Sequence, residues 1–333
     1  MSSVGARPRF LEVDIWRAFA ILGVIFIHIE GGSIHFFKGG SLIFTSFLIL
    51  DQLLRYCVPL FVFISGFTLT LSYAKNDFNL GTFIKKRLWR ILPWYFFWSA
   101  VIYYYTRFLF PEKVGKYPLW ELVLLGKTDY HLYFVSMIFQ LYLLFPLLLF
   151  FFRKNWRGLL ILAFIFQSLV YMVSSLNAQG IIRLPFVWYD QQQYVFSGSW
   201  IFYFILGMVF TIEKFESAVL RFKKILPYLL LLFFAWAVYD TFRLLGLGDV
   251  IIAERSTRIP LLLCTTIFLL TLFCFRNVHA ILPKRIVSCF VYLGKMSYVI
   301  YLLHTLVSRL LPNPNKQYVP KTQKSKMPKN QRA

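Results

Sequence analysis

The amino-acid sequence predicts an all-α protein, a polytopic bundle of transmembrane helices. Composition is the first observation behind this prediction: of 333 residues, 59% are hydrophobic, 20% aromatic and only 15% charged. Soluble domains typically carry about 25% charged and about 45–50% apolar residues. The second observation is a series of apolar stretches of the length that crosses a bilayer, roughly twenty residues at about 1.5 Å each. One water-soluble core cannot bury so much apolar surface, so we expect lipid to surround it.

The chain contains nine candidate spans separated by short segments. They cover residues 13–30, 43–74, 88–110, 131–152, 158–176, 197–212, 225–243, 258–275 and 294–311. The second span is long, and we expect Pro59 to kink or divide it, because proline lacks the N–H that a helix interior requires. The segment from Trp120 to Leu125 is too short to cross and is expected at the membrane interface.

Lys and Arg residues predict the orientation. With the N-terminus inside, the inner segments hold nearly twice as many of them as the outer ones, which favours a cytoplasmic N-terminus. The net charge of +22 is therefore explained by membrane topology, and we expect no nucleic-acid partner. The four cysteines lie in or beside apolar stretches without metal-ligand spacing, so neither cysteine chemistry nor a metal site is expected.

The expected domain organisation is one membrane domain, residues 1–311, followed by a basic tail, residues 312–333. Nine spans would place this tail outside, whereas a Lys-rich tail is typical of a cytoplasmic or disordered segment. Either one span is misassigned or a further helix is missing from the chain.

The first span carries polar residues that are costly in a membrane, and each therefore requires a reason. Arg17 and His28 are eleven residues apart, so they share one helix face about 16 Å apart along the axis. Asp14 lies three residues before Arg17 and can pair with it. Histidine can accept and return a proton near neutral pH, which suits it to acid–base catalysis. The alternative is that Arg17 extends to lipid headgroups and His28 bonds another helix.

Further motifs lie in later spans. Arg87 and Arg90 share a face at the start of the third span, where guanidinium groups and a helix N-terminus would bind phosphate, or else anchor the helix to anionic lipid. Ser65 and Gly66 form a small pair where helices can approach closely. His131 begins the fourth span and is expected at the outer interface. Tyr301 and His304 share a face of the last span, where a single histidine is more often structural.

Taken together, these motifs resemble the acyltransferase 3 family of integral membrane acyltransferases. The resemblance covers about residues 9–311 and depends on the order and spacing of its parts. The matching parts are Arg17 with His28; residues 59–67, including Ser65-Gly66-Phe67; Arg87-Leu88-Trp89-Arg90 followed by Pro93; residues 131–146; and Ser297 to His304.

The resemblance implies a membrane-bound O-acyltransferase of the bacterial plasma membrane. The donor would be cytoplasmic acyl-CoA, often acetyl-CoA, used as a cosubstrate without a bound cofactor. The acceptor would be a hydroxyl of a carbohydrate or related cell-envelope molecule. His28 would be the catalytic base with Arg17 as its partner, and Arg87 and Arg90 would bind the donor's phosphates. The residues implied in supporting positions are Asp14, Ser65, Tyr301 and His304.

Two other functions remain open from the sequence. A transporter or flippase of a glycan or lipid-linked sugar would also need polar residues within the membrane, but it would not use CoA. A membrane scaffold or sensor would catalyse no reaction. Members of the resembled family usually have ten spans, and the tenth is absent after Leu311, so we expect a truncated chain or an altered reading frame at this end.

Overall fold

The computed structural model describes residues 11–33, 37, 40–74, 78–109, 118–124, 126–182, 192–247, 253 and 255–310. These residues are predominantly helical and contain no strand, which confirms the predicted all-α fold. The helices are α1 (Leu11–Ser33), α2 (Leu42–Leu54), α3 (Cys57–Tyr73), α4 (Leu80–Leu109), α6 (Leu119–Leu124), α7 (Tyr133–Ala178), α8 (Gln192–Val195), α9 (Ile201–Val209), α10 (Glu213–Arg221), α11 (Leu226–Gly246), α13 (Ile259–Cys274) and α14 (Lys284–Leu310), with 3-10 turns η2 (Ser197–Ser199) and η3 (Arg276–Ile281).

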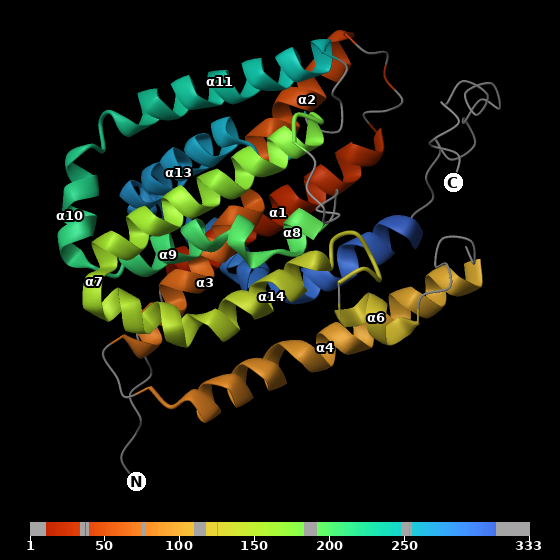
Figure 1. Cartoon of the computed structure of the whole chain (residues 1–333), viewed down its shortest axis with the longest axis horizontal. Coiled ribbons are helices and arrows are strands. Elements are labelled where there is room, and N and C mark those ends of the chain that lie inside the picture. The colour runs from red at the N-terminus through yellow and green to blue at the C-terminus, as the bar shows by residue number, and fades with distance from the viewer. Residues whose placement is uncertain are drawn as a thin grey trace.

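The long helices lie side by side along the longest axis of the molecule (Figure 1). Helix α10, the bend of α7 and the start of α4 lie at one end, on the left of the view. Helices α6 and α8 and the end of α11 lie at the other. The most extensive packing joins α1 to α14, α3 to α9 and α11 to α13. The bundle is therefore built from helix pairs that combine distant parts of the sequence.

Two predicted breaks in the helices have local causes. The long second span is divided into α2 and α3 just before Pro59, which has no N–H to donate to the carbonyl of Arg55. Helix α7 is bent at Asn155, whose backbone is non-helical (φ −155°, ψ 83°). The Asn155 Oδ1 accepts a 3.0 Å hydrogen bond from the Gly158 N–H and so caps the second half of α7. The halves correspond to the expected spans 131–152 and 158–176.

The expected span 197–212 differs from the structure. Helix α9 has only nine residues, about 14 Å, and is too short to cross a bilayer. Every residue from Phe202 to Val209 is buried, and α9 packs on α3 and α7. A helix that is apolar on all sides can be surrounded by either lipid or protein. Here protein surrounds it, so α9 is a core helix.

Helices α3 and α9 touch through two glycines. A Cβ on Gly66 would overlap the backbone carbonyl of Phe204, and a Cβ on Gly207 would overlap that of Phe63. Small residues at such contacts let helix backbones approach closely. The packing role predicted for Gly66 is confirmed, and Gly207 is its counterpart on α9.

Four helical segments in the described part of the chain are long and apolar enough to cross a membrane. They are Leu42–Tyr73, Tyr133–Ala178, Leu226–Gly246 and Lys284–Leu310. Helix α13 is apolar but shorter, and α1 and α4 are not in this set. Helix α1 carries Asp14, Arg17 and His28, and α4 carries basic residues and many Trp and Tyr. Among the described residues, the other expected spans are therefore shorter or more polar than these four segments, or form part of the long helix α7.

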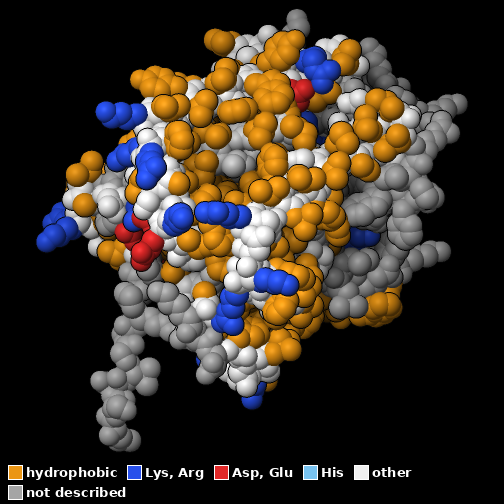
Figure 2. All heavy atoms as spheres, turned by 60° about the vertical axis from the view of Figure 1, so that its left-hand side comes forward, with side chains coloured by type: hydrophobic (Ala, Val, Ile, Leu, Met, Phe, Trp, Pro, Cys, Tyr) orange, Lys and Arg blue, Asp and Glu red, His pale blue; other side chains and the backbone are white. Residues whose placement is uncertain are grey.

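The outer surface is rich in large hydrophobic side chains, including Trp89, Phe108 and Leu231. Figure 2 shows broad hydrophobic areas, with Lys and Arg side chains gathered among them on the part brought forward from the left of Figure 1. This distribution is typical of an integral membrane protein with a basic end. The predicted basic tail, residues 312–333, lies outside the described residues, and the division at residue 311 remains a prediction.

Candidate active site

Three histidines from distant parts of the sequence meet near the C-terminal end of α1. We call His28, His131 and His304 the histidine group. The His28 Nδ1 lies 2.5 Å from the His304 Nε2, and the two ring planes are within 11° of parallel. The ring centroid of His131 lies 4.9 Å from that of His304 and 6.3 Å from that of His28. Among the described residues, no His, Cys, Asp and Glu side chains form a group that could hold a metal ion.

The packing of α14 on α1 positions His28 and His304. Gly294 lies against the backbone of Asp14, where a Cβ would overlap the Asp14 carbonyl oxygen. The contact between His28 and His304 lies further along both helices, so α1 and α14 run in the same direction. The two helices approach closely at Gly294, and the two imidazoles meet about three turns later on α14 and about four turns later on α1.

The turn before α7 positions His131 and fastens it to α14. The Tyr301 hydroxyl donates to the His131 carbonyl. The Asp129 carboxylate accepts hydrogen bonds from Thr305 Oγ1 at 3.1 Å and Arg309 Nη2 at 2.8 Å. The His131 side chain is 1% exposed, and neither ring nitrogen has a hydrogen-bond partner among the described residues. Its Nδ1 lies 3.6 Å from the Asp129 Oδ2.

A small cavity of about 90 Å³ opens beside the histidine group. His28, His131 and Tyr301 line it together with Arg55 and apolar residues of α1 and α3. Arg55 lies at the break between α2 and α3, where its Nε and Nη2 donate to the Asp51 Oδ2 at 2.9 and 2.6 Å. The cavity therefore combines the buried imidazole of His131 and the half-buried imidazole of His28 with one guanidinium group. Such an arrangement is suited to moving a proton and stabilising negative charge.

A second polar group lies nearer the start of α1. We call Arg17, Arg87 and Arg90, with Tyr142 and Ser65, the arginine group. Arg17 is close enough to Arg90 and Tyr142 to interact with them electrostatically. The guanidinium of Arg87 lies 5.6 Å from the ring centroid of Tyr142, whose hydroxyl donates to Ser65 Oγ at 3.5 Å.

The arginine group is short of negative charge. The Arg17 Nη1 lies 3.3 Å from the Asp14 Oδ1, as predicted. Among the described residues neither Arg87 nor Arg90 forms an ion pair, and the buried Arg87 Nε has no hydrogen-bond partner. Guanidinium groups without an ion-pair partner can bind an anion such as phosphate. Helix α4 begins at Leu80, two to three turns before these arginines, so the expected dipole of a helix N-terminus does not act on them.

The predicted site residues thus divide between two places. Tyr301 and His304 join His28 in the histidine group, whereas Asp14 and Ser65 lie with the arginines. Arg17 does not contact His28, because eleven residues of α1 separate them by about 16 Å.

A family model described as an acyltransferase domain, that of acyltransferase 3, matches residues 10–316, nearly the whole chain. The chain belongs to the acyltransferase 3 family. No curated protein and no solved structure matches the chain. The match spans both polar groups and all the helices that build them. The protein is therefore a member of a family of membrane acyltransferases.

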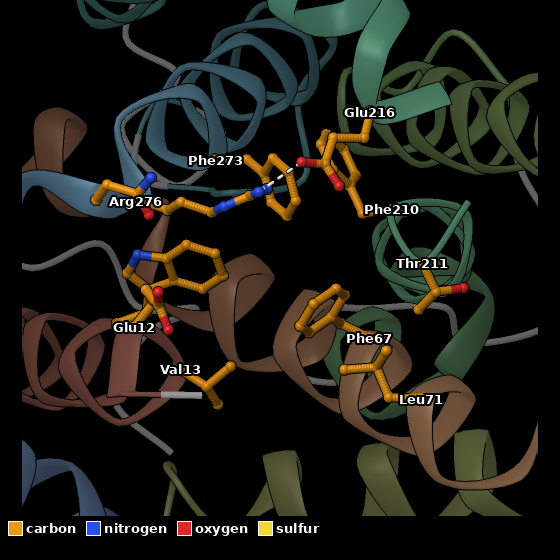
Figure 3. A pocket seen from close by; sticks show the side chains of 11 residues that line it. Glu12, Val13, Phe67, Leu71, Phe210, Thr211, Glu216, Phe273 and Arg276 are labelled. Carbon is orange, nitrogen blue, oxygen red and sulfur yellow. Dashed lines mark ion pairs between the residues drawn. The ribbon is translucent and has the colours of Figure 1, made fainter. Parts of the chain in front are cut away.

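This acyltransferase 3 protein has a second and larger cavity, of about 350 Å³, near the start of α1. Its wall includes Trp16, Phe67 and Phe273, and none of the predicted site residues lines it. In Figure 3, Arg276 reaches past Phe273 to Glu216. The two charged groups form an ion pair of 2.5 Å, and the Arg276 guanidinium lies 4.5 Å from the Phe273 ring centroid.

Two site residues were not predicted from the sequence. His131 was expected at the outer interface, yet it is buried in the histidine group. Arg55 lies within a long apolar stretch, at the break before Pro59, and lines the cavity. Helical spacing relates residues on one helix, whereas these contacts join residues from separate elements. An ionisable residue inside an apolar stretch was the available signal at Arg55.

Proposed function

We propose that the protein is a membrane-bound O-acyltransferase that moves an acyl group, acetyl in the simplest case, from cytoplasmic acyl-CoA to a hydroxyl of a cell-envelope glycan or related acceptor. The observation that carries the proposal is that α1 contributes Arg17 to one polar group and His28 to the other. An arginine group suited to phosphate lies about 16 Å along the helix from the histidine group.

The separation of the two groups supports an acyl-CoA donor. In this donor a flexible pantetheine arm separates the phosphates from the reactive thioester. Arg17, Arg87 and Arg90 would bind phosphate oxygens, and the arm would extend along α1 toward His28. Arg17 then acts in donor binding and not as the direct partner of His28. The Lys and Arg side chains at the arginine end support a cytoplasmic location for that end in a bacterial plasma membrane.

The histidine group supports the transfer step. His28 would take the proton from the acceptor hydroxyl as its oxygen attacks the thioester carbonyl. Arg55 and His131 line the same cavity and would donate hydrogen bonds to the oxygen that becomes negative. The tetrahedral intermediate would then lose CoA as a thiolate, which recovers the proton from His28. The products are an ester and free CoA.

The size of the cavity supports transfer over transport. Sites that enclose a whole drug-sized ligand are about 300–1,000 Å³, and the cavity at His28 is about 90 Å³. This cavity can hold the reacting groups but is too small for a whole glycan to pass through it. A transporter or flippase would have to move its cargo elsewhere, without using CoA.

The test uses membranes that contain the protein and matched membranes that lack it. Radiolabelled acetyl-CoA is added, and the envelope fraction is assayed for label released by hydroxylamine, which cleaves esters. Protein-dependent, hydroxylamine-sensitive label supports acyl transfer. Movement of a glycan across the membrane without any incorporation of label would contradict it and favour the transporter.

A further inference from the structure

His304 determines which nitrogen of His28 acts as the base, and we propose that it is a positioning residue for the transfer. This inference rests on the proposed function. It starts from the 2.5 Å distance between His28 Nδ1 and His304 Nε2. The two nitrogens are closer than van der Waals contact allows, and the ring planes are within 11° of parallel. The rings therefore meet through an N–H···N hydrogen bond.

The direction of this hydrogen bond follows from its neighbour. The His304 Nδ1 lies 2.8 Å from the backbone carbonyl oxygen of Tyr301. A carbonyl oxygen can only accept, so His304 Nδ1 carries the hydrogen. A neutral imidazole has one N–H, which leaves His304 Nε2 as an acceptor. His28 Nδ1 must therefore donate, and the lone pair of His28 is placed on Nε2.

This arrangement gives His28 one defined tautomer in the absence of a carboxylate. Among the described residues, no carboxylate oxygen lies within ion-pair distance of His28 or His304. The nearby Asp129 is engaged by Thr305 and Arg309. In serine-type triads a carboxylate holds the catalytic imidazole in its tautomer and stabilises the imidazolium. Here a second imidazole, held by a backbone carbonyl, takes that place.

The hydrogen bond also has a role during transfer. When His28 Nε2 takes the acceptor's proton, His28 becomes an imidazolium, and its Nδ1–H bond to His304 Nε2 becomes charge-assisted and stronger. The two rings share the charge until the proton passes from His28 Nε2 to the leaving thiolate. No further acid or base is needed, since the proton that leaves the acceptor ends on CoA.

The position of His304 is set by contacts that continue beyond the ring. Tyr301 donates through its hydroxyl to the His131 carbonyl, and Thr305 and Arg309 bond Asp129. These contacts fasten one turn on either side of His304 to the segment before α7. The imidazole is held by its surroundings before any substrate binds, as preorganised catalytic groups are.

The experiment reads the tautomer directly. The chain has five histidines, so ¹⁵N-histidine-labelled protein in lipid bilayers gives a simple solid-state NMR spectrum, and His28→Asn identifies the His28 signals. We expect His28 protonated at Nδ1 and unprotonated at Nε2. His304→Ala should shift His28 toward the Nε2-protonated tautomer that free histidine favours. His304→Gln should preserve the native tautomer, because its amide can donate to Tyr301 and accept from His28.

Kinetics complete the test. His304→Ala should lower kcat with acetyl-CoA by about 10²-fold, the scale of acid–base catalysis, and leave the donor KM unchanged. His304→Gln should retain most of the activity that His304→Ala loses, and His279→Ala, in η3, is the control histidine. An Nε2-protonated His28 in the wild-type protein overturns the proposal, as does an unchanged kcat in His304→Ala. If the wild-type protein transfers no acyl group, the proposed function fails, while the spectrum still decides the role of His304.

Discussion

At the scale of single residues, the ionisable side chains at the two ends of α1 have different partners. A charge in the apolar part of a bilayer is costly, and this cost is met differently at the two ends of α1. Arg17 pairs with Asp14, whereas His28 bonds a second imidazole. Under the proposed function, the arginine group binds the anionic part of the donor and the histidine group acts at the reacting carbonyl.

Arg90 is predicted to act on the phosphates of the donor and on nothing else. Arg90→Ala should raise the KM for acetyl-CoA about 10-fold or more, the loss expected for a hydrogen bond to a charged group. With acetyl-pantetheine, which lacks the phosphates, the variant and the wild-type protein should have equal rates. Lys85→Ala, on another face of α4, is the control. An equal loss with both donors would show that Arg90 supports the fold and not the phosphates.

The two polar groups were only partly predictable at this scale. The spacing of Arg17 and His28 correctly placed them on one helix, three turns apart, because helical geometry fixes that relation. Spacing could not show that His131 and His304 meet His28. That contact depends on the close approach of α14 at Gly294 and on the turn that ends at Leu132. Neither leaves a periodic pattern in the sequence.

At the scale of helices, the core depends on the contact between α3 and α9. Gly66 and Gly207 face the partner helix's backbone in reciprocal positions, and α9 is buried along its length. The sequence showed the small pair on α3, but its apolar run could not distinguish lipid from protein as the surroundings of α9. Composition measures apolarity, and only the tertiary structure decides what covers it.

Gly207 is predicted to be essential to this contact. Gly207→Ala should force α3 and α9 apart and lower the stability of the detergent-solubilised protein by about 1–3 kcal/mol, as overpacked cores do. Gly246→Ala on α11 is the matched control, because a Cβ there meets nothing. A thermal-unfolding midpoint that falls in the first variant and not in the second supports the account. Equal midpoints would mean that the helices accommodate the extra methyl group.

At the scale of the whole molecule, the bundle separates a basic end from an end that holds the histidine group. Figures 1 and 2 show the bend of α7, α10 and the start of α4 at one end, with Lys and Arg side chains among hydrophobic surfaces. Composition predicted the fold class, because the apolar content leaves no soluble alternative. The number of membrane-crossing helices was less predictable from the sequence. Helix α7 is bent, α9 is buried in protein and α1 carries polar residues, so none of them is a straight apolar helix surrounded by lipid.

The orientation is testable with two introduced cysteines. In a background with Cys289→Ser, which removes the exposed native thiol, Lys127→Cys should react with a membrane-impermeant maleimide in intact cells. Lys154→Cys, next to the bend of α7, should react only after the cells are opened. The reverse pattern would place the arginine group outside, where no acyl-CoA is present, and would contradict the proposed route of the donor.

The most direct measurement is acyl transfer from radiolabelled acetyl-CoA in membranes that contain equal amounts of wild-type protein or His28→Ala. The account predicts ester-linked label in the envelope fraction with the wild-type protein and a loss of about 10²-fold or more in the variant, because the acceptor hydroxyl loses its base. Equal transfer by the two proteins would contradict the account and remove His28 from the chemistry.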